Sequence, residues 1–269
     1  FRGSYGGRHV IPLWRDQHGK SANLTRGVLN VLAKCYERSV APKDFFAYTY
    51  AVLSAPEYVE HFEEELEIPG PRLPITKDAT CFKEVAALGR ELLWLHTYGE
   101  HFVPEDTRPG TNGLPQGAAR LKKATPTNPD HYPDEWHYDR STQELRIGDK
   151  EHHGIITGVS PAVMDLSVSG LKPVKSWLDY RMKSGAGRTS SPLDDIRPNT
   201  WSFDSELQDL LWMLEATLTR YDRANDLLRQ VIEGDAFSAD DFLDPTDEER
   251  KGPNGNPEAQ PAPLFGELE

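Results

Sequence analysis

The hydrophobic residues of this chain change their spacing along the sequence, and this change limits the folds that the chain can adopt. In the first hundred residues, and again between residues 206 and 230, apolar positions recur every three to four residues, as in amphipathic helices. Between residues 136 and 159 the pattern alternates, as in half-buried strands. We therefore predict an α+β fold, with helical N- and C-terminal parts around a central mixed or antiparallel β region.

The local signals place individual elements within this outline. A hairpin is predicted where Trp136–Asp139 and Glu144–Ile147 alternate around Arg140–Gln143, and Gly154–Val159 is a third strand candidate. Helices are predicted at 24–38, 45–54, 56–66, 79–96, 162–166, 172–183 and, as one long or broken helix, 206–230. Asn23 or Thr25 is expected to cap the first of them, and Asp78 or Thr80 the fourth.

Composition divides the chain into four regions. Residues 1–97 form a helical part, and 98–134 form a Pro-, Gly- and Thr-rich stretch that is too long for an ordinary loop and is expected to be a functional or mobile excursion. Residues 135–232 hold the hairpin and further helices and are the predicted recognition part. Residues 233–269 form an acidic, proline-rich tail that is expected to be disordered or loosely packed.

The charge distribution decides which partners are possible. The formal net charge of −13 by itself argues against a nucleic-acid binder. However, residues 233–269 carry eleven acidic and two basic residues, whereas residues 106–197 carry thirteen basic and twelve acidic ones. The negative charge is thus concentrated in the tail, and a nucleic-acid surface in the middle third remains open.

Three further features bear on the setting of the chain. It begins with Phe1 rather than Met, so we expect a piece of a longer or processed polypeptide, and no apolar run approaches the roughly 18 residues that a membrane span needs. Cys35 and Cys81 lie in helix-like stretches and are predicted to be buried, reduced thiols without metal-ligand spacing.

Two motif-like clusters suggest metal chemistry, and both are weak. Asp134 and Glu144 with Arg146 resemble a metal-nuclease pattern, but the usual lysine is replaced by arginine. Histidines and acids gather nearby without a common zinc spacing, at Asp130, His131, Asp134, Glu135, His137, His152 and His153. We predict no catalytic residue and no metal site in this chain.

One cation-rich set can instead bind DNA, because Lys and Arg bind phosphates, Ser and Thr donate to them, and Arg reads guanine. The predicted DNA-binding residues are Arg120, Lys122, Lys123, Lys172, Lys175, Arg181, Lys183, Arg188, Ser190 and Ser191. Base contacts are expected from loops within 98–134 and 184–200. For the residues from Lys172 to Ser191, the competing interpretation is a surface helix with a core tryptophan, followed by a capped loop.

Eight short blocks carry a family resemblance over residues 9 to about 220. They are Ile11–Trp14, Phe46–Leu53 with Pro56, Pro71–Pro74, Leu88–Leu92 through His96, Gly158–Pro161, Ser169–Gly170, Lys175–Leu178 and Ser191–Ile196. In order and spacing the chain resembles the C-terminal specificity domain of type ISP restriction-modification enzymes, in their actinobacterial form.

This resemblance implies a target-recognition domain that reads double-stranded DNA within one large cytoplasmic polypeptide for phage defence. It implies a partner methyltransferase domain in the same polypeptide, whose parts use S-adenosylmethionine, ATP and Mg, and no cofactor in this fragment. Two alternatives stay open: a protein-interaction or scaffold module, motivated by the acidic balance and the apolar helix at 45–54, and a metal nuclease at Asp134 and Glu144.

Overall fold

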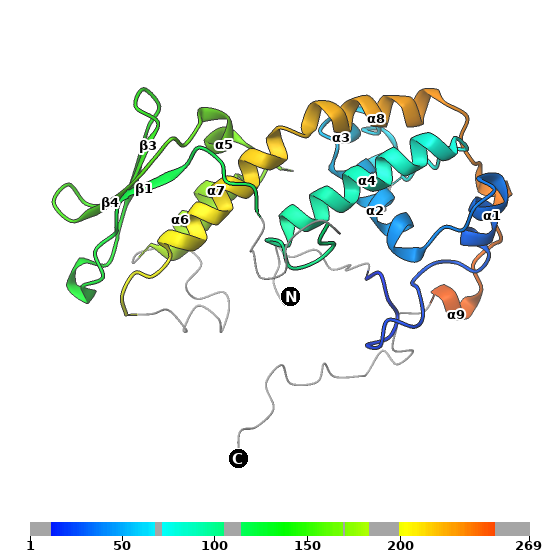
Figure 1. The fold of residues 1–269 in the computed structure, drawn as a ribbon, viewed down its shortest axis with the longest axis horizontal. Helices are drawn as coiled ribbons and strands as arrows, with labels where there is room; N and C mark the ends of the chain where they lie inside the picture. Colours follow the sequence, from blue (N-terminus) through cyan, green and yellow to red (C-terminus); the bar gives the residue numbers. More distant parts are fainter. Residues whose placement is uncertain (1–11, 68–71, 105–113, 169, 183–198, 251–269) are drawn as a thin grey trace, which may run out of the picture. The chain divides into compact units, whose positions relative to one another are not determined.

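The computed structural model describes residues 12–67, 72–104, 114–168, 170–182 and 199–250. They divide into two compact units, a sheet unit formed by the described residues from 91 to 223 and a helical unit formed by those from 12 to 90 and from 224 to 250. The helices are α1 (Val28–Cys35), α2 (Pro42–Ser54), α3 (Glu57–His61), α4 (Ala79–His96), α5 (Pro161–Asp165), α6 (Pro173–Arg181), α7 (Asp204–Leu218), α8 (Tyr221–Glu233) and α9 (Asp247–Arg250) (Figure 1). No helix in these ranges is long and apolar enough to cross a membrane.

The sheet unit is built on four antiparallel strands in the order β1-β4-β3-β2. The strands are β1 (Arg120–Lys123), β2 (Trp136–Asp139), β3 (Glu144–Gly148) and β4 (His153–Thr157). The predicted hairpin is present, with Trp136 opposite Ile147 and Asp139 opposite Glu144. The observed architecture confirms the α+β class.

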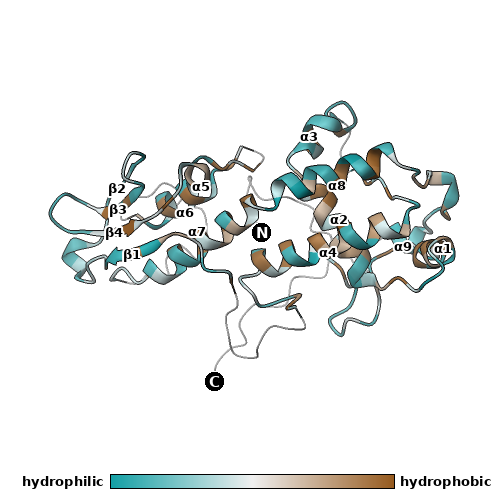
Figure 2. Ribbon diagram, turned by 45° about the horizontal axis from the view of Figure 1, so that its top comes forward, coloured by the Kyte–Doolittle hydropathy of each residue, from teal (hydrophilic) through white to brown (hydrophobic). Residues whose placement is uncertain are grey.

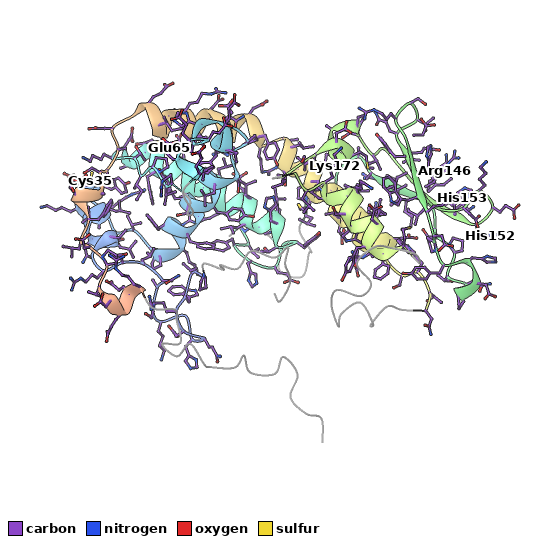
Figure 3. All side chains as sticks on the ribbon, turned by 180° about the vertical axis from the view of Figure 1, so that it is seen from behind. Cys35, Glu65, Arg146, His152, His153 and Lys172 are labelled. Atoms are coloured by element: carbon purple, nitrogen blue, oxygen red, sulfur yellow. The ribbon has the colours of Figure 1, made fainter. Side chains whose placement is uncertain are left out.

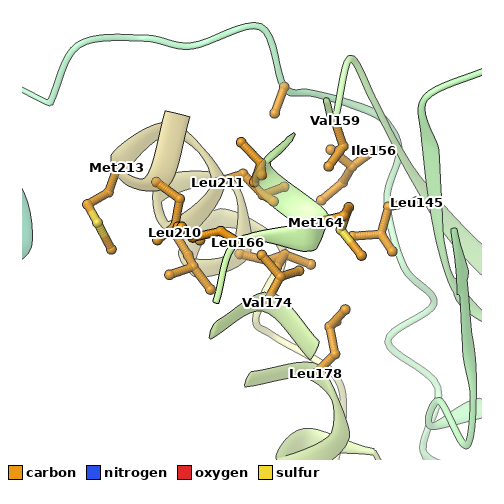
Figure 4. Packing of buried hydrophobic residues seen from close by; sticks show 14 of the residues in the cluster. Leu145, Ile156, Val159, Met164, Leu166, Val174, Leu178, Leu210, Leu211 and Met213 are labelled. Carbon is orange, nitrogen blue, oxygen red and sulfur yellow. The ribbon is translucent and has the colours of Figure 1, made fainter. Parts of the chain in front are cut away.

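One face of the sheet is packed against helices α5, α6 and α7, which lie together on one side of it in Figures 1 and 2. Leu145, Ile147 and Ile156 point into this core and are fully buried. Figure 4 shows Leu145 beside Met164 of α5, with Ile156, Leu178 of α6 and Leu211 of α7 in the same cluster. Burial of each of these side chains stabilises the fold by on the order of 1.5–3 kcal/mol. The alternation of β3 therefore fixes which of its side chains face the core and which face of the sheet is left open.

The helical unit packs α2 against the first part of α4. Tyr48 stacks on Phe82 with ring centroids 4.7 Å apart. Gly89 lies so close to α2 that a Cβ atom there would come within 1.8 Å of the carbonyl oxygen of Ala47, so only glycine fits. The prediction that Asp78 caps α4 is confirmed, because its carboxylate accepts from the backbone N–H groups of Thr80 and Cys81.

Several expectations for the helical unit were wrong. Cys35 is exposed rather than buried, whereas Cys81 is buried. The N-cap of α1 is Gly27, with a φ of 82° and no side-chain cap bond, and not Asn23 or Thr25. By contrast, the prediction of one long or broken helix over 206–230 is confirmed in its broken form, since α7 and α8 are separated at residues 219 and 220.

Part of the acidic tail also differs from the expectation of a disordered or loosely packed segment. The backbone N–H of Lys77 donates to Asp235, and that of Phe237 donates to Ile75. At the start of α9, the backbone N–H of Thr246 donates to the carboxylate of Glu249, and the backbone N–H of Glu249 donates to the hydroxyl of Thr246. The carboxylate of Glu249 also accepts from the backbone N–H of Arg26. Residues 235–250 therefore belong to the helical unit, and residues 251–269 lie outside the described part.

Candidate nucleic-acid interface

The outer face of the sheet, opposite α5–α7, carries polar and charged side chains in regular cross-strand rows. One row runs from Lys123 on β1 through Ile155 and Arg146 to His137 on β2. Toward the ends of the strands, Arg120 lies opposite Thr157 and Glu144 lies opposite Asp139. The guanidinium of Arg120 lies over the ring of Trp212 on α7 and donates to the carbonyl of Ala119. Figure 3 shows Arg146 and His153 on the side of the sheet away from the helices, with Lys172 on the helical side. Lys123, His137 and Arg146 on this face are exposed.

Strand β1 forms one edge of the sheet and is exposed at all four of its positions. Its residues are mostly charged, so the strand is coloured largely hydrophilic in Figure 2. A register shift between Leu121 and Lys123 places Lys122 in a bulge. The segment before β1 is anchored to α7, because the indole N–H of Trp212 donates to the carbonyl of Ala119 over 2.8 Å. The segment after β1 is anchored by Asp204, which accepts from the backbone N–H and the hydroxyl of Thr125.

Two cations of this face, Lys122 and Arg146, share the carboxylate of Glu144. Lys122 Nζ lies 2.8 Å from Glu144 Oε1, whereas Arg146 Nη2 lies 3.8 Å from Glu144 Oε2. The hydrogen bond from Lys122 holds the pKa of Glu144 below its usual value, and Arg146 adds to this effect. Lys123 makes no side-chain hydrogen bond or ion pair within the described residues. The face around Glu144 therefore retains a net positive charge.

A cavity of about 600 Å³ opens at the end of the outer face where β2, β3 and β4 meet the β3–β4 turn. Its lining residues are Glu135, Trp136, His137, Arg146, Gly148, Asp149, Lys150 and His153. Asp149 shapes the turn, since its carboxylate accepts from the backbone N–H groups of Glu151 and His152, and these bonds lower its pKa. Gly148 has a φ of 112°, which only glycine adopts readily.

Helix α6, which lies on the helical side of the sheet and is bonded to the edge strand β2, carries the second predicted group of cations. Lys175 Nζ lies 2.7 Å from Asp179 Oδ2, four residues along the same helix. The indole N–H of Trp136 on β2 donates to the other oxygen of Asp179 over 2.8 Å. Burial alone would raise the pKa of Asp179, but these two hydrogen bonds hold it below its usual value. Lys172 is exposed at the start of the helix.

Arg181 at the end of α6 is enclosed by aromatic rings. Its guanidinium carbon lies 3.8 Å from the ring centroid of Trp177 and 5.1 Å from that of Phe203. Glu206 forms an ion pair with Arg181 over 3.8 Å, and the side chain of Arg181 is only 26% exposed. A smaller cavity of about 360 Å³ beside it is lined by Tyr98, Trp177, Arg181, Glu206 and Asp209, and desolvation raises the pKa of Asp209.

The structure therefore separates the predicted DNA-binding residues. Arg120, Lys122 and Lys123 lie together on β1, whereas Lys172, Lys175 and Arg181 lie on α6 or at its start, on the helical side of the sheet near the opposite edge strand β2. With about 4.8 Å between neighbouring strands, the two edge strands are roughly 14 Å apart. Lys183, Arg188, Ser190 and Ser191, with most of the 184–200 loop, lie outside the described residues. β1 itself lies inside the 98–134 stretch that we expected to be a loop.

Sequence reasoning assigned the central residues of the outer face to other chemistry. Arg146 entered only as a misfit in a nuclease pattern, and His137 and His153 only as metal candidates. The period-2 alternation of β2–β4 would have placed these side chains opposite the core and therefore on one face. Among the described residues, no group of three or more His, Cys, Asp or Glu side chains converges for a metal ion. His131 and His152 instead stack on each other with ring centroids 3.6 Å apart.

The fold and this face define an α+β domain with an open, cation-bearing antiparallel sheet. Residues 1–212 match the model of the Type ISP C-terminal specificity domain, and the chain therefore belongs to that family. No curated relative matches the sequence.

Two solved structures are similar to the chain. One is titled "cryoEM structure DrdV-DNA complex"; the similarity has a TM-score of 0.51 at 19% identity and covers 83% of this chain and 21% of that one. The other is a nuclease-deletion mutant of the Type ISP restriction-modification enzyme LlaGI in complex with a DNA substrate mimic, with a TM-score of 0.41, 17% identity and coverage of 72% and 14%. At 19% identity the first likeness shows the fold, and the chain spans about a fifth of that protein.

Proposed function

We propose that this chain recognises a specific double-stranded DNA sequence as the target-recognition part of a type ISP restriction-modification polypeptide. The observation that carries the proposal is the match of residues 1–212 to the specificity-domain model of that family. The open face of the sheet, with Lys122, Lys123 and Arg146, supplies a surface of suitable charge.

The geometry of this face suits the major groove of DNA. That groove is about 12 Å wide and admits a two-stranded β-ribbon. The β2–β3 hairpin is such a ribbon, and its outer side chains include His137 and Arg146, with the carboxylates of Asp139 and Glu144 next to them toward the turn. The lysines of β1 lie two strands away from β3, where they can contact the phosphate backbone beside the groove. Binding then combines a salt-dependent phosphate contribution with a base-reading one.

The partner of this chain in the proposal is a methyltransferase domain of the same polypeptide, which acts on an adenine that the specificity part selects. S-adenosylmethionine, ATP and Mg are assigned to the remainder of that polypeptide. Among the residues that the structure describes, no three metal ligands come together.

Fluorescence anisotropy with labelled duplexes tests the proposal. The 269-residue chain and the full-length product of its gene are titrated with random-sequence DNA between 50 and 200 mM salt. We expect the logarithm of affinity to fall linearly with the logarithm of salt, with a slope of about −0.9 for each phosphate contacted. We also expect sequences selected from a random pool by the full-length product to share one motif.

Absence of binding at low salt by both proteins would overturn the proposal. The protein-interaction alternative would then gain support, because the helical unit has an apolar groove of about 380 Å³ beside α2. Phe45, Phe46, Tyr50, Leu53 and Leu73 are among its lining residues.

A further inference from the structure

Arg146 occupies the centre of the open sheet face. It lies on β3, directly between Ile155 on β4 and His137 on β2, and its side chain is 49% exposed. Its one ion pair within the described residues is the 3.8 Å contact with Glu144, and that carboxylate is already bonded to Lys122 at 2.8 Å. The planar guanidinium therefore keeps most of its five donors available for a ligand above the sheet.

The charges around Arg146 favour a nucleobase over a phosphate. The cavity that Arg146 lines contains two carboxylates, Glu135 and Asp149, beside the cations Lys150 and Arg146. Carboxylates repel a phosphate, whereas a neutral base edge carries both donors and acceptors and matches a lining of mixed sign. A phosphate is better placed near Lys122 and Lys123, where the nearest carboxylate is already paired with Lys122.

The position of Arg146 is also fixed by rigid structure. It belongs to a strand that is paired on both sides, and Leu145 and Ile147 on either side of it are fully buried. The adjoining turn is held by Asp139, which accepts from the hydroxyl and the N–H of Ser141. A side chain on such a scaffold is presented in a defined direction, as selective contacts require.

We infer that Arg146 is a specificity-determining residue that reads a guanine in the DNA target, while Lys122 and Lys123 hold the phosphate backbone. This inference rests on the proposed function. Its physical basis is that the arginine fork can donate two parallel hydrogen bonds to O6 and N7 of guanine, which no other base offers together in the major groove. A lysine at the same place supplies a charge but no planar fork.

The test is selection of binding sites from a random duplex pool by the full-length gene product, with Arg146→Lys and Arg146→Ala variants. The matched control is Arg140→Lys on the same hairpin, because Arg140 is occupied by both oxygens of Asp165. We expect the wild-type protein and the control to select one motif that contains an invariant guanine. Both Arg146 variants should lose the preference at that guanine and keep it at the other positions.

A second measurement uses the selected duplex with 7-deazaguanine at the invariant position, which removes the N7 acceptor. We expect the affinity of the wild-type protein to fall about 10-fold, within the range of a bidentate base contact. The affinity of Arg146→Lys should change less than 2-fold, and its binding to random DNA should match that of the wild-type protein.

The outcomes separate the inference from the proposed function. If the wild-type protein selects no motif and does not bind random DNA, the proposed function fails. If it selects a motif that both Arg146 variants reproduce in full, DNA recognition stands and the role of Arg146 is overturned. Circular dichroism and thermal melting of each variant establish that the sheet has remained folded.

Discussion

Two groups of cations, one on the sheet and one on α6, lie in different surroundings. On β1 and β3, Lys122 and Arg146 share the carboxylate of Glu144, and Lys123 is exposed. On α6, Lys175 is paired with Asp179, and Arg181 lies against the rings of Trp177 and Phe203 with Glu206 beside it. The same residue types therefore serve different ends: those on the sheet can meet an anion, whereas those on the helix mainly hold the helix in place.

The largest expected effect is on DNA affinity when the β1 lysines are removed. In Lys122→Ala/Lys123→Ala, loss of two phosphate contacts should weaken binding to random DNA about 30-fold at 50 mM salt and reduce the salt slope by about 1.8. Anisotropy titrations at several salt concentrations measure both quantities. The matched control is Lys172→Ala/Lys175→Ala, which removes the same charge from α6 and should weaken binding less than 3-fold. A larger loss in the control than in the β1 variant would reverse the comparison.

The second effect is on stability, and it concerns α6. Arg181→Ala removes a guanidinium that stacks on Trp177 and packs near Phe203, so unfolding should become easier by about 1.5 kcal/mol. Urea denaturation measures this loss. Arg181→Lys should recover little of it because a lysine lacks the planar stacking surface.

The control for Arg181 is Arg140→Ala, which removes an exposed ion pair with Asp165 and should change stability much less. DNA affinity per folded molecule should be nearly unchanged by Arg181→Ala. A loss of affinity without a loss of stability would instead identify Arg181 as a DNA contact.

Part of this contrast could be predicted from the sequence. Asp179 follows Lys175 by four residues, and Trp177 precedes Arg181 by four, so both partners lie on the same side of a helix. The alternation in 136–147 also predicted the hairpin, which is confirmed.

Other parts depend on contacts between residues far apart in the sequence. Glu206 reaches Arg181, and Glu144 reaches Lys122, only after the chain has folded. Strand β1 could not be recognised because its residues, Arg-Leu-Lys-Lys, are all exposed and show no buried alternation. It is a strand because β4 pairs with it and α7 holds the segment before it.

A third prediction concerns pH and the hairpin that presents Arg146. Hydrogen bonds from the hydroxyl and the N–H of Ser141, and from the N–H of Thr142, lower the pKa of Asp139 to about 2 from a usual 3.8. A carboxyl whose pKa is lower in the folded state stabilises it above the unfolded value and loses this contribution as pH falls toward 2. The stability difference between the wild-type protein and Asp139→Asn should therefore be full above about pH 4 and shrink toward pH 2.

Urea denaturation of both proteins between pH 2 and pH 6 measures this difference. Asp165→Asn, which removes the exposed carboxylate of the neighbouring ion pair with Arg140, serves as the control. A difference between the wild-type protein and Asp139→Asn that is constant across this range would show that Asp139 does not anchor the turn. The hairpin would then present Arg146 less rigidly than the contacts indicate.

The smallest expected effect is the most direct challenge to the comparison. Asp179→Asn removes the charge that neutralises Lys175 but keeps an oxygen that can accept from the indole of Trp136. If α6 lies away from the DNA, the newly unpaired Lys175 acts only at long range, where salt screens it, and affinity should rise by no more than about 2-fold at 50 mM salt. Anisotropy at 50 and 200 mM salt measures this change. A rise of 10-fold or more that disappears in Asp179→Asn/Lys175→Ala would mean that Lys175 reaches a phosphate once unpaired. Asp179 would then set the affinity of a second DNA-facing surface, and the two groups of cations would act together rather than separately.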